Sequence, residues 1–157
     1  HDNVITSIPS ELFDATTFGI SIAEASVLDP HQRLLLEVGY ANLAIAGSTR
    51  SSLMASNTGV FVGAMTANDW KCSPLSPFAA NGHSSAALAG RVSFILGLQG
   101  PCMAVETLCS SSLVAFDTAF ISIQRERCSQ ALIAGINLIL TAETSCILCS
   151  VRAMSPD

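Results

Sequence analysis

The sequence predicts an α/β fold in which a mostly parallel sheet is covered by helices on both faces. Three short apolar runs, bounded by glycine or polar residues, have the length and composition of buried strands. Helical patterns separate these runs along the chain, and this alternation is typical of parallel sheets. Of the 157 residues, 50% are hydrophobic and 12% are charged, which is enough for one domain with a substantial core.

Two helix starts precede the first strand. Ser21–Glu24 has the capping-box form, in which a serine is followed three residues later by a glutamate. Residues 29–32, "DPHQ", repeat the pattern with proline at the first helical position. The second helix should run from there to Gly47, with Arg33 and Glu37 one turn apart on its solvent side.

The remaining elements alternate between strand and helix. The patterns predict, in order, a strand over 58–65, a helix over 84–96, a strand over 102–107, a helix from about 109 to 127, a strand over 130–140 and a helix from 141 to about 154.

The segment from Thr66 to His83 interrupts this alternation. It carries the single tryptophan and two prolines and has no clear periodicity. Loops of this length in compact domains tend to be functional or disordered. We expect an ordered segment that lines an interface or channel, and a floppy surface loop is the alternative.

Charge and hydropathy exclude some classes of partner. The net charge is −5 with seven scattered Lys and Arg, which gives no basic stripe for nucleic acid. The longest apolar runs fall far short of the ~20 residues that span a bilayer, so no membrane span is expected.

Six cysteines are spaced irregularly in a chain rich in core residues, which indicates reduced, mostly buried thiols in a cytoplasmic protein. Cys146 and Cys149 form a lone pair without histidine ligands at a suitable spacing, which disfavours zinc. No metal site is expected.

Cys109 lies between a predicted strand and a predicted amphipathic helix. Backbone N–H groups at a helix N-terminus lack intrahelical partners and favour negative charge, which lowers the pKa of a thiol and can hold an oxyanion. Acyl-transfer enzymes place nucleophiles on such a strand-to-helix turn. Cys109 is therefore a candidate nucleophile, with a buried structural cysteine as the alternative. Ser110, Ser111 and Ser112 are each expected to cap the helix.

A cysteine nucleophile needs a base or an oxyanion donor, typically histidine. The chain offers His1, His31 and His83. His1 is terminal, and His31 in a first helical turn is expected to be solvated. His83 is the remaining candidate, although it can equally cap the helix that it precedes.

Several stretches, in order, resemble the β-ketoacyl synthases, in particular the ketosynthase domain of modular type I polyketide synthases. They are "FDATTFGISIAEASVLDPHQRLLLEV", "TGVFVGAM", "SSAALAGRVSFILGLQGP", "VETLCSSSLVAFDTA", "ALIAGINLIL" and "VRAMSPD". The resemblance implies a thiolase-like layered α-β-α-β-α fold, with residues 1–157 as its N-terminal half, a fragment that is a partial ketosynthase domain. It also implies a homodimer with strand 102–107 near the two-fold axis, and Cys109 as the active-site cysteine.

In that family the cysteine takes an acyl chain from a thioester. Two downstream histidines then assist decarboxylation of a malonyl-type extender and its Claisen condensation. Their motifs are absent from these 157 residues, so the residues alone are expected to be inactive. The resemblance implies no directly bound cofactor, because substrates arrive on the phosphopantetheine of acyl carrier protein. The implied partners are acyl carrier protein, neighbouring synthase domains, and acyl and malonyl-type thioesters.

Two alternatives stay open beside polyketide extension. One is a fatty acid synthase ketosynthase, and the other is a non-elongating condensing-like domain kept for dimerisation or chain transfer. The chain also departs from the family pattern, which usually has Asp-Thr-Ala before the cysteine, where this chain has Glu106, Thr107 and Leu108. A leucine there takes volume that alanine leaves, which can narrow the acyl pocket or tilt the turn. Ile22 replaces a usual proline and His31 a common glutamine, and both changes should be tolerated.

Overall fold

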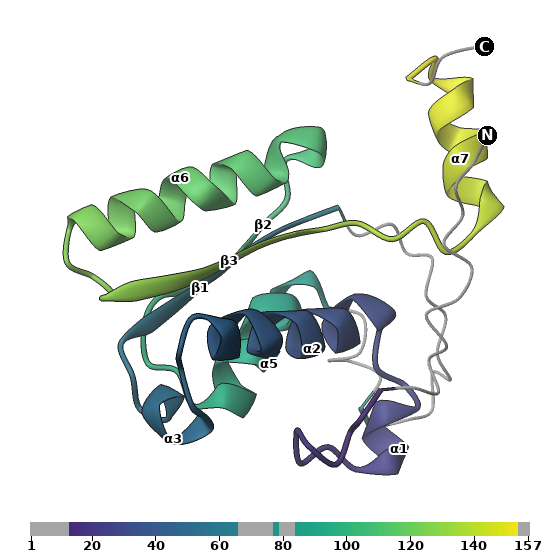
Figure 1. Cartoon of the computed structure of the whole chain (residues 1–157). Helices are drawn as coiled ribbons and strands as arrows, with labels where there is room; N and C mark the ends of the chain where they lie inside the picture. The colour runs from purple at the N-terminus through teal and green to yellow at the C-terminus, as the bar shows by residue number, and fades with distance from the viewer. Residues whose placement is uncertain (1–12, 66–76, 79–83, 154–157) are drawn as a thin grey trace.

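The computed structural model describes residues 13–65, 77–78 and 84–153. Three parallel strands form one sheet in the order β2-β1-β3. Figure 1 shows α6 on one face of this sheet and α2 with α5 on the other. The predicted α/β arrangement, a parallel sheet covered on both faces, is thereby confirmed. The strands are β1 Thr58–Ala64, β2 Cys102–Val105 and β3 Gln130–Ile136. The helices are α1 Ile22–Ala25, α2 Pro30–Ile45, α3 Arg50–Leu53, α5 Ser85–Leu96, α6 Ser111–Gln124 and α7 Ala142–Ser150.

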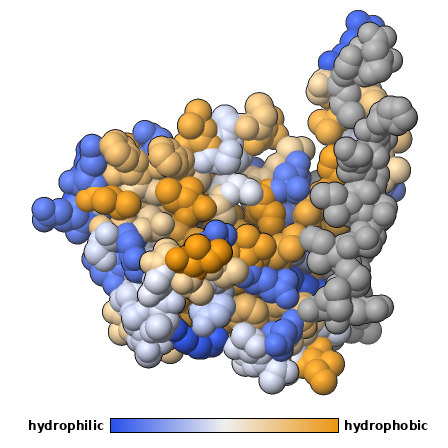
Figure 2. All heavy atoms as spheres, in the orientation of Figure 1, coloured by the Kyte–Doolittle hydropathy of each residue, from blue (hydrophilic) through white to orange (hydrophobic). Residues whose placement is uncertain are grey.

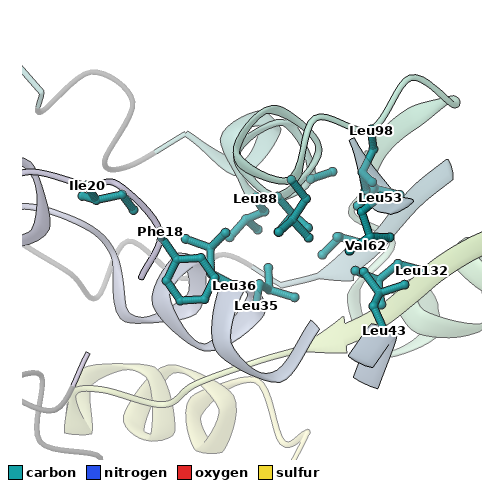
Figure 3. Close-up of a cluster of buried hydrophobic side chains, with 14 of the residues drawn as sticks. Phe18, Ile20, Leu35, Leu36, Leu43, Leu53, Val62, Leu88, Leu98 and Leu132 are labelled. Carbon is teal, nitrogen blue, oxygen red and sulfur yellow. The ribbon is translucent and has the colours of Figure 1, made fainter. Parts of the chain in front are cut away.

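The central strand β1 is buried along its whole length and divides the core in two. Because side chains alternate between faces of a strand, Val60 and Val62 face α2 and α5, whereas Phe61 faces α6. Figure 3 shows Val62 and Leu132 from the sheet near Leu88 of α5 and Leu36 of α2. The smaller cluster joins Phe61 to alanines on the buried face of α6. Both faces of the sheet are thus packed, as the apolar runs predict.

The ends of α2 follow the predicted signals. The Asp29 carboxylate accepts a hydrogen bond from the His31 amide, and Pro30 occupies the first helical position. Gly47, with φ 88°, lies just beyond the helix, where its amide bonds to the Ala44 carbonyl. Such a left-handed residue suits glycine and closes the helix.

Two side chains of α2 differ from the prediction. Arg33 was expected on the solvent side, but it is buried, and its guanidinium donates two hydrogen bonds to the Leu28 carbonyl, at 3.0 and 2.8 Å. Burial lowers the pKa of Arg33. His31 was expected to be solvated, yet only 2% of it is exposed. In both cases a polar side chain bonds inside the protein, which an amphipathic pattern does not reveal.

Several elements are shorter than predicted, because strand pairing ends before the apolar run does. The last pair of β1 with β3 is Ala64 with Ile136, and residues 137–140 pair with no strand within the described part of the chain. The last pair with β2 joins Gly63 to Val105, and the chain then turns. A 3-10 turn over Leu108–Ser110 precedes α6, and α7 ends at Ser150. The short α3, which begins with a capping box between Thr49 and Ser52, is not among the predicted helices.

The cysteines also differ from expectation. Cys128 is buried, whereas Cys102, Cys109, Cys146 and Cys149 are exposed. The expectation of mostly buried thiols is therefore wrong for the described residues. Cys72 and most of the segment from Thr66 to His83 lie outside them. In the described part of the chain, no helix is long and apolar enough to cross a membrane.

Candidate active site

Cys109 lies in the 3-10 turn that connects β2 to α6, at the mouth of a cavity. The cavity has a volume of about 740 Å³. Its walls come from the ends of β1 and β3, the turn, the first residues of α6, Leu148 of α7, and Ala153 beyond that helix. The Cys109 thiol is therefore placed where the carboxyl ends of parallel strands meet a helix start, a usual position for ligand sites in such sheets.

Two serines hold the turn by hydrogen bonds: Ser110, the N-cap residue of α6, and Ser111, the first residue of that helix. The Ser111 hydroxyl accepts a hydrogen bond from the Thr107 amide at 2.8 Å and donates one to the Leu108 carbonyl at 2.7 Å. The Ser110 hydroxyl donates to the carbonyl and the hydroxyl of Thr107, at 2.8 and 2.9 Å. Both hydroxyls thus bond backward to the turn, and the expectation that they cap α6 is wrong.

Leu108 has a left-handed backbone, with φ 57°, and its side chain borders the cavity beside Cys109. A residue with a Cβ atom pays roughly 1–2 kcal/mol for this conformation. Such strain persists where the surrounding structure enforces it. The Leu108 side chain is 65% exposed, so it projects into the open space next to the thiol rather than into the core.

The start of α6 lies directly on the sheet, because two glycines leave room for it. Gly63 of β1 and Gly135 of β3 are paired in register. A methyl group on Gly63 would overlap the Ser111 carbonyl group, and one on Gly135 would lie 2.7 Å from the Ser112 Cβ. Both glycines line the cavity of Cys109. The turn is therefore fixed against a flat, side-chain-free part of the sheet.

The first turn of α6 faces this cavity without a side-chain cap from its N-cap residue, Ser110. The helix dipole favours negative charge at this position, and the Ser111 amide is bonded to the Leu108 carbonyl of the turn. A thiolate, or the oxyanion that forms when a thiolate attacks a carbonyl, carries such a charge. The arrangement is suited to nucleophilic chemistry by Cys109.

His31 takes part in an internal bridge instead of facing solvent. Its Nε2 accepts a hydrogen bond from the Leu138 amide at 3.0 Å, so its proton lies on Nδ1, which donates to the Asp29 carboxylate at 2.7 Å. The bridge ties the start of α2 to the segment that follows β3. That segment continues from Asn137, a residue of the cavity wall. The aspartate two residues before the histidine was the only signal of this role in the sequence.

The structure assigns no base to Cys109 from the candidates of the sequence. His83 and His1 lie outside the described residues, and His31 does not line the cavity of Cys109. Cys146 and Cys149 of α7 border a different hollow, of about 780 Å³. Within the described ranges, Cys109 is the cysteine that the structure brings to the carboxyl edge of the sheet.

Comparisons with known proteins agree with this geometry. The family model "Beta-ketoacyl synthase, N-terminal domain" matches residues 3–157. The cyclo-acetoacetyl-L-tryptophan synthase of Aspergillus oryzae is 42% identical over 149 residues, which cover 92% of this chain and 4% of that protein. A highly reducing polyketide synthase of Penicillium polonicum is 40% identical over 93% of this chain and 6% of its own length.

A fatty acid synthase of Anser anser anser is 36% identical over 92% of this chain. Among solved structures, the ketosynthase from module 6 of the bacillaene synthase of Bacillus subtilis 168 superposes with a TM-score of 0.82 at 32% identity. That match covers 94% of this chain and 26% of the solved ketosynthase. The chain therefore spans 4–6% of the two fungal synthases, 26% of the solved ketosynthase and 43% of the fatty acid synthase sequence, although almost all of the chain is matched.

Proposed function

Because the chain belongs to the β-ketoacyl synthase family, matching its N-terminal domain, we propose that it supplies the acyl-accepting cysteine, Cys109, of a polyketide ketosynthase. The fold is the thiolase-like fold of its structural neighbours. The proposed activity is acyl transfer followed by decarboxylative Claisen condensation, which extends an acyl chain. The observation that carries the proposal is Cys109 in the strand-to-helix turn, beside the uncapped start of α6.

In the first step, the Cys109 thiolate attacks the carbonyl carbon of an acyl thioester. The oxyanion that forms lies near the amides of the first turn of α6, which stabilise it. The carbon–sulfur bond to the donor then breaks, and the donor thiol leaves with the proton that Cys109 gave up. In the second step, a malonyl-type thioester loses carbon dioxide, and its carbanion attacks the acyl group on Cys109. The product leaves as a β-ketoacyl thioester, and the Cys109 thiolate is regenerated.

The partners follow from this chemistry. Acyl carrier protein delivers both thioesters on its phosphopantetheine arm, so the chain itself holds no cofactor. The two histidines that assist decarboxylation belong to a later part of the domain, and neighbouring synthase domains load and modify the chain. Residues 1–157 form a partial ketosynthase domain in this proposal, and the whole domain acts as a homodimer in the cytoplasm.

The exposed apolar surface of α6 supports the proposal that these residues form part of a larger domain. Large apolar side chains lie exposed along this helix, among them Leu113, Phe116, Phe120 and Ile123. Figure 2 shows hydrophobic residues at the surface over α6. Apolar surface of this kind is usually covered by another part of the protein. We assign that role to the remainder of the ketosynthase domain, since the matched ketosynthase is about four times as long, with 26% of it covered.

A fatty acid synthase is the second candidate, because one is matched over 92% of this chain. Polyketide synthases are favoured, since the fungal relatives are 40–42% identical and the fatty acid synthase is 36% identical. A non-elongating scaffold domain is disfavoured by the presence of Cys109 in its turn.

The test is condensation by the full-length synthase with Cys109→Ala and, as the matched control, Cys146→Ala. Both residues are exposed cysteines, but only Cys109 borders the cavity at the carboxyl edge of the sheet. We expect Cys109→Ala to abolish product and Cys146→Ala to retain it. Product formation by Cys109→Ala at the wild-type rate would overturn the proposal.

A further inference from the structure

Ser111 is a buried polar residue at the point where three features of the site meet. It is 4% exposed, it is the first residue of α6, and its carbonyl group lies against Gly63. Its hydroxyl is engaged twice, as the acceptor of the Thr107 amide and as the donor to the Leu108 carbonyl. These two bonds reach backward across Cys109 to the residues that precede it.

From this geometry we propose that Ser111 is the positioning residue of the nucleophile, which holds Leu108 in its left-handed conformation and so fixes the direction of Cys109. The proposal rests on the function proposed for Cys109. Without the hydroxyl, the Thr107 amide loses its side-chain acceptor, and the Leu108 carbonyl loses its side-chain donor while it keeps the bond from the Ser111 backbone amide.

The sheet restricts the movement of Ser111, whose two hydroxyl hydrogen bonds to Thr107 and Leu108 we call the Ser111 clasp. Ser111 cannot move toward β1, because its carbonyl group already lies where a side chain of Gly63 would be. Gly135, which pairs with Gly63 across β1 and β3, likewise leaves the space beside the Ser112 Cβ free of a side chain. The backbone of Ser111 is thus held against the sheet, and its hydroxyl holds the turn through two hydrogen bonds. A displacement of about 1 Å at a reacting group can lower a rate roughly a hundredfold.

Ser122 offers a matched control on the same helix. It is 5% exposed, and its hydroxyl donates to the Thr118 carbonyl at 2.8 Å, three turns away from Cys109. Replacing either serine by alanine removes one buried hydroxyl from the same face of α6. A general effect on the helix should therefore appear in both variants, whereas an effect on the nucleophile should appear only at Ser111.

The experiment measures acylation of the full-length synthase by an acyl N-acetylcysteamine thioester, as kcat and KM, for Ser111→Ala and Ser122→Ala. We expect Ser111→Ala to lower kcat by about tenfold or more with KM unchanged, and Ser122→Ala to leave kcat within about twofold. Equal effects of the two substitutions on kcat, or a loss at Ser111 confined to KM, would overturn the positioning role. Acylation that persists in Cys109→Ala would instead overturn the proposed function, so the two failures are distinguishable.

A second pair of variants covers the case in which Ser111→Ala does not fold. Glycine adopts a left-handed backbone readily, so Leu108→Gly should lessen the need for the Ser111 clasp. We expect the double variant Leu108→Gly/Ser111→Ala to fold and to acylate within about threefold of Leu108→Gly, a coupling that independent sites do not show. A double variant that is unfolded, or one that acylates about tenfold or more slowly than Leu108→Gly, would contradict the inference.

Discussion

Leu108 stands where the family usually has alanine, directly before Cys109, and its side chain borders the same cavity as the thiol. The sequence predicts a narrower acyl pocket or a tilted turn. The structure places this side chain in the open space of the cavity, where the acyl chain on Cys109 would lie. Leu108 is thus a candidate determinant of chain specificity.

We predict that Leu108→Ala in the full-length synthase favours bulkier acyl chains. Replacing the isobutyl group by a methyl group opens volume beside Cys109, and a single methylene group of pocket space changes selectivity by roughly 10–200-fold. The measurement is the ratio of kcat/KM for a branched acyl thioester to that for an acetyl thioester. An unchanged ratio would show that Leu108 does not border the bound chain.

A second prediction about a single residue concerns His31. His31→Leu leaves the Leu138 amide without its acceptor, and a lost buried hydrogen bond costs about 1–3 kcal/mol. Hydrogen exchange of the full-length synthase should then show faster exchange at Leu138. His31→Gln, whose side-chain oxygen can accept the same bond, is the control and should keep protection. Equal exchange in His31→Leu and the wild type would refute the bridge.

At the scale of elements, the position of α6 on the sheet depends on Gly63. A methyl group there overlaps the Ser111 backbone, so Gly63→Ala must shift the start of α6 and the turn that carries Cys109. Gly90 of α5 has open space around its Cα, so Gly90→Ala is the matched control.

We predict that Gly63→Ala lowers both the melting temperature and the acylation rate of the full-length synthase. Gly90→Ala should leave the acylation rate unchanged and stabilise the protein by up to ~1 kcal/mol, since alanine is the better helix former. Thermal unfolding and acylation measured on both variants decide this. A Gly63→Ala variant with wild-type values for both would mean that α6 does not rest on β1 as described.

The sequence was sufficient for the order of the elements but not for their ends. Apolar runs and helix signals predict each strand and most helices, because burial and capping are local properties of the residues. β3 ends with the last residue of β1, Ala64, whereas β2 ends one pair earlier, where the chain turns toward Cys109, and both ends are set by tertiary structure. The Cys109 turn was predicted from its spacing, whereas the Ser111 clasp and the His31 bridge join groups whose roles are set by packing.

At the scale of the whole molecule, β2 is an edge strand of the described sheet, with β1 on one side only. Met103 in this strand is 43% exposed. An edge strand with unpaired backbone groups and apolar side chains is suited to pairing with another strand. This agrees with the proposed homodimer, in which this strand lies near the two-fold axis.

We predict that Met103→Arg converts the full-length synthase to monomer and weakens condensation. In a symmetric interface each substitution is present twice, and two arginines close to the axis repel each other. Light scattering gives the oligomeric state, and Ile22→Arg, at an exposed position of α1, is the control that should remain dimeric. A Met103→Arg protein with the mass of a dimer would place the interface elsewhere.

Competition among the thiols for an alkylating reagent tests whether Cys109 is the nucleophile. The intact protein is treated briefly with iodoacetamide near neutral pH, and the labelled cysteines are identified by peptide mapping. We expect Cys109 to label first, because it is exposed and lines the cavity at the start of α6. Desolvation raises the pKa of the Cys102 thiol, so Cys102 should label slowly at neutral pH and faster only as the pH rises. Faster labelling of Cys102 or Cys128 than of Cys109 in the folded protein would contradict the account.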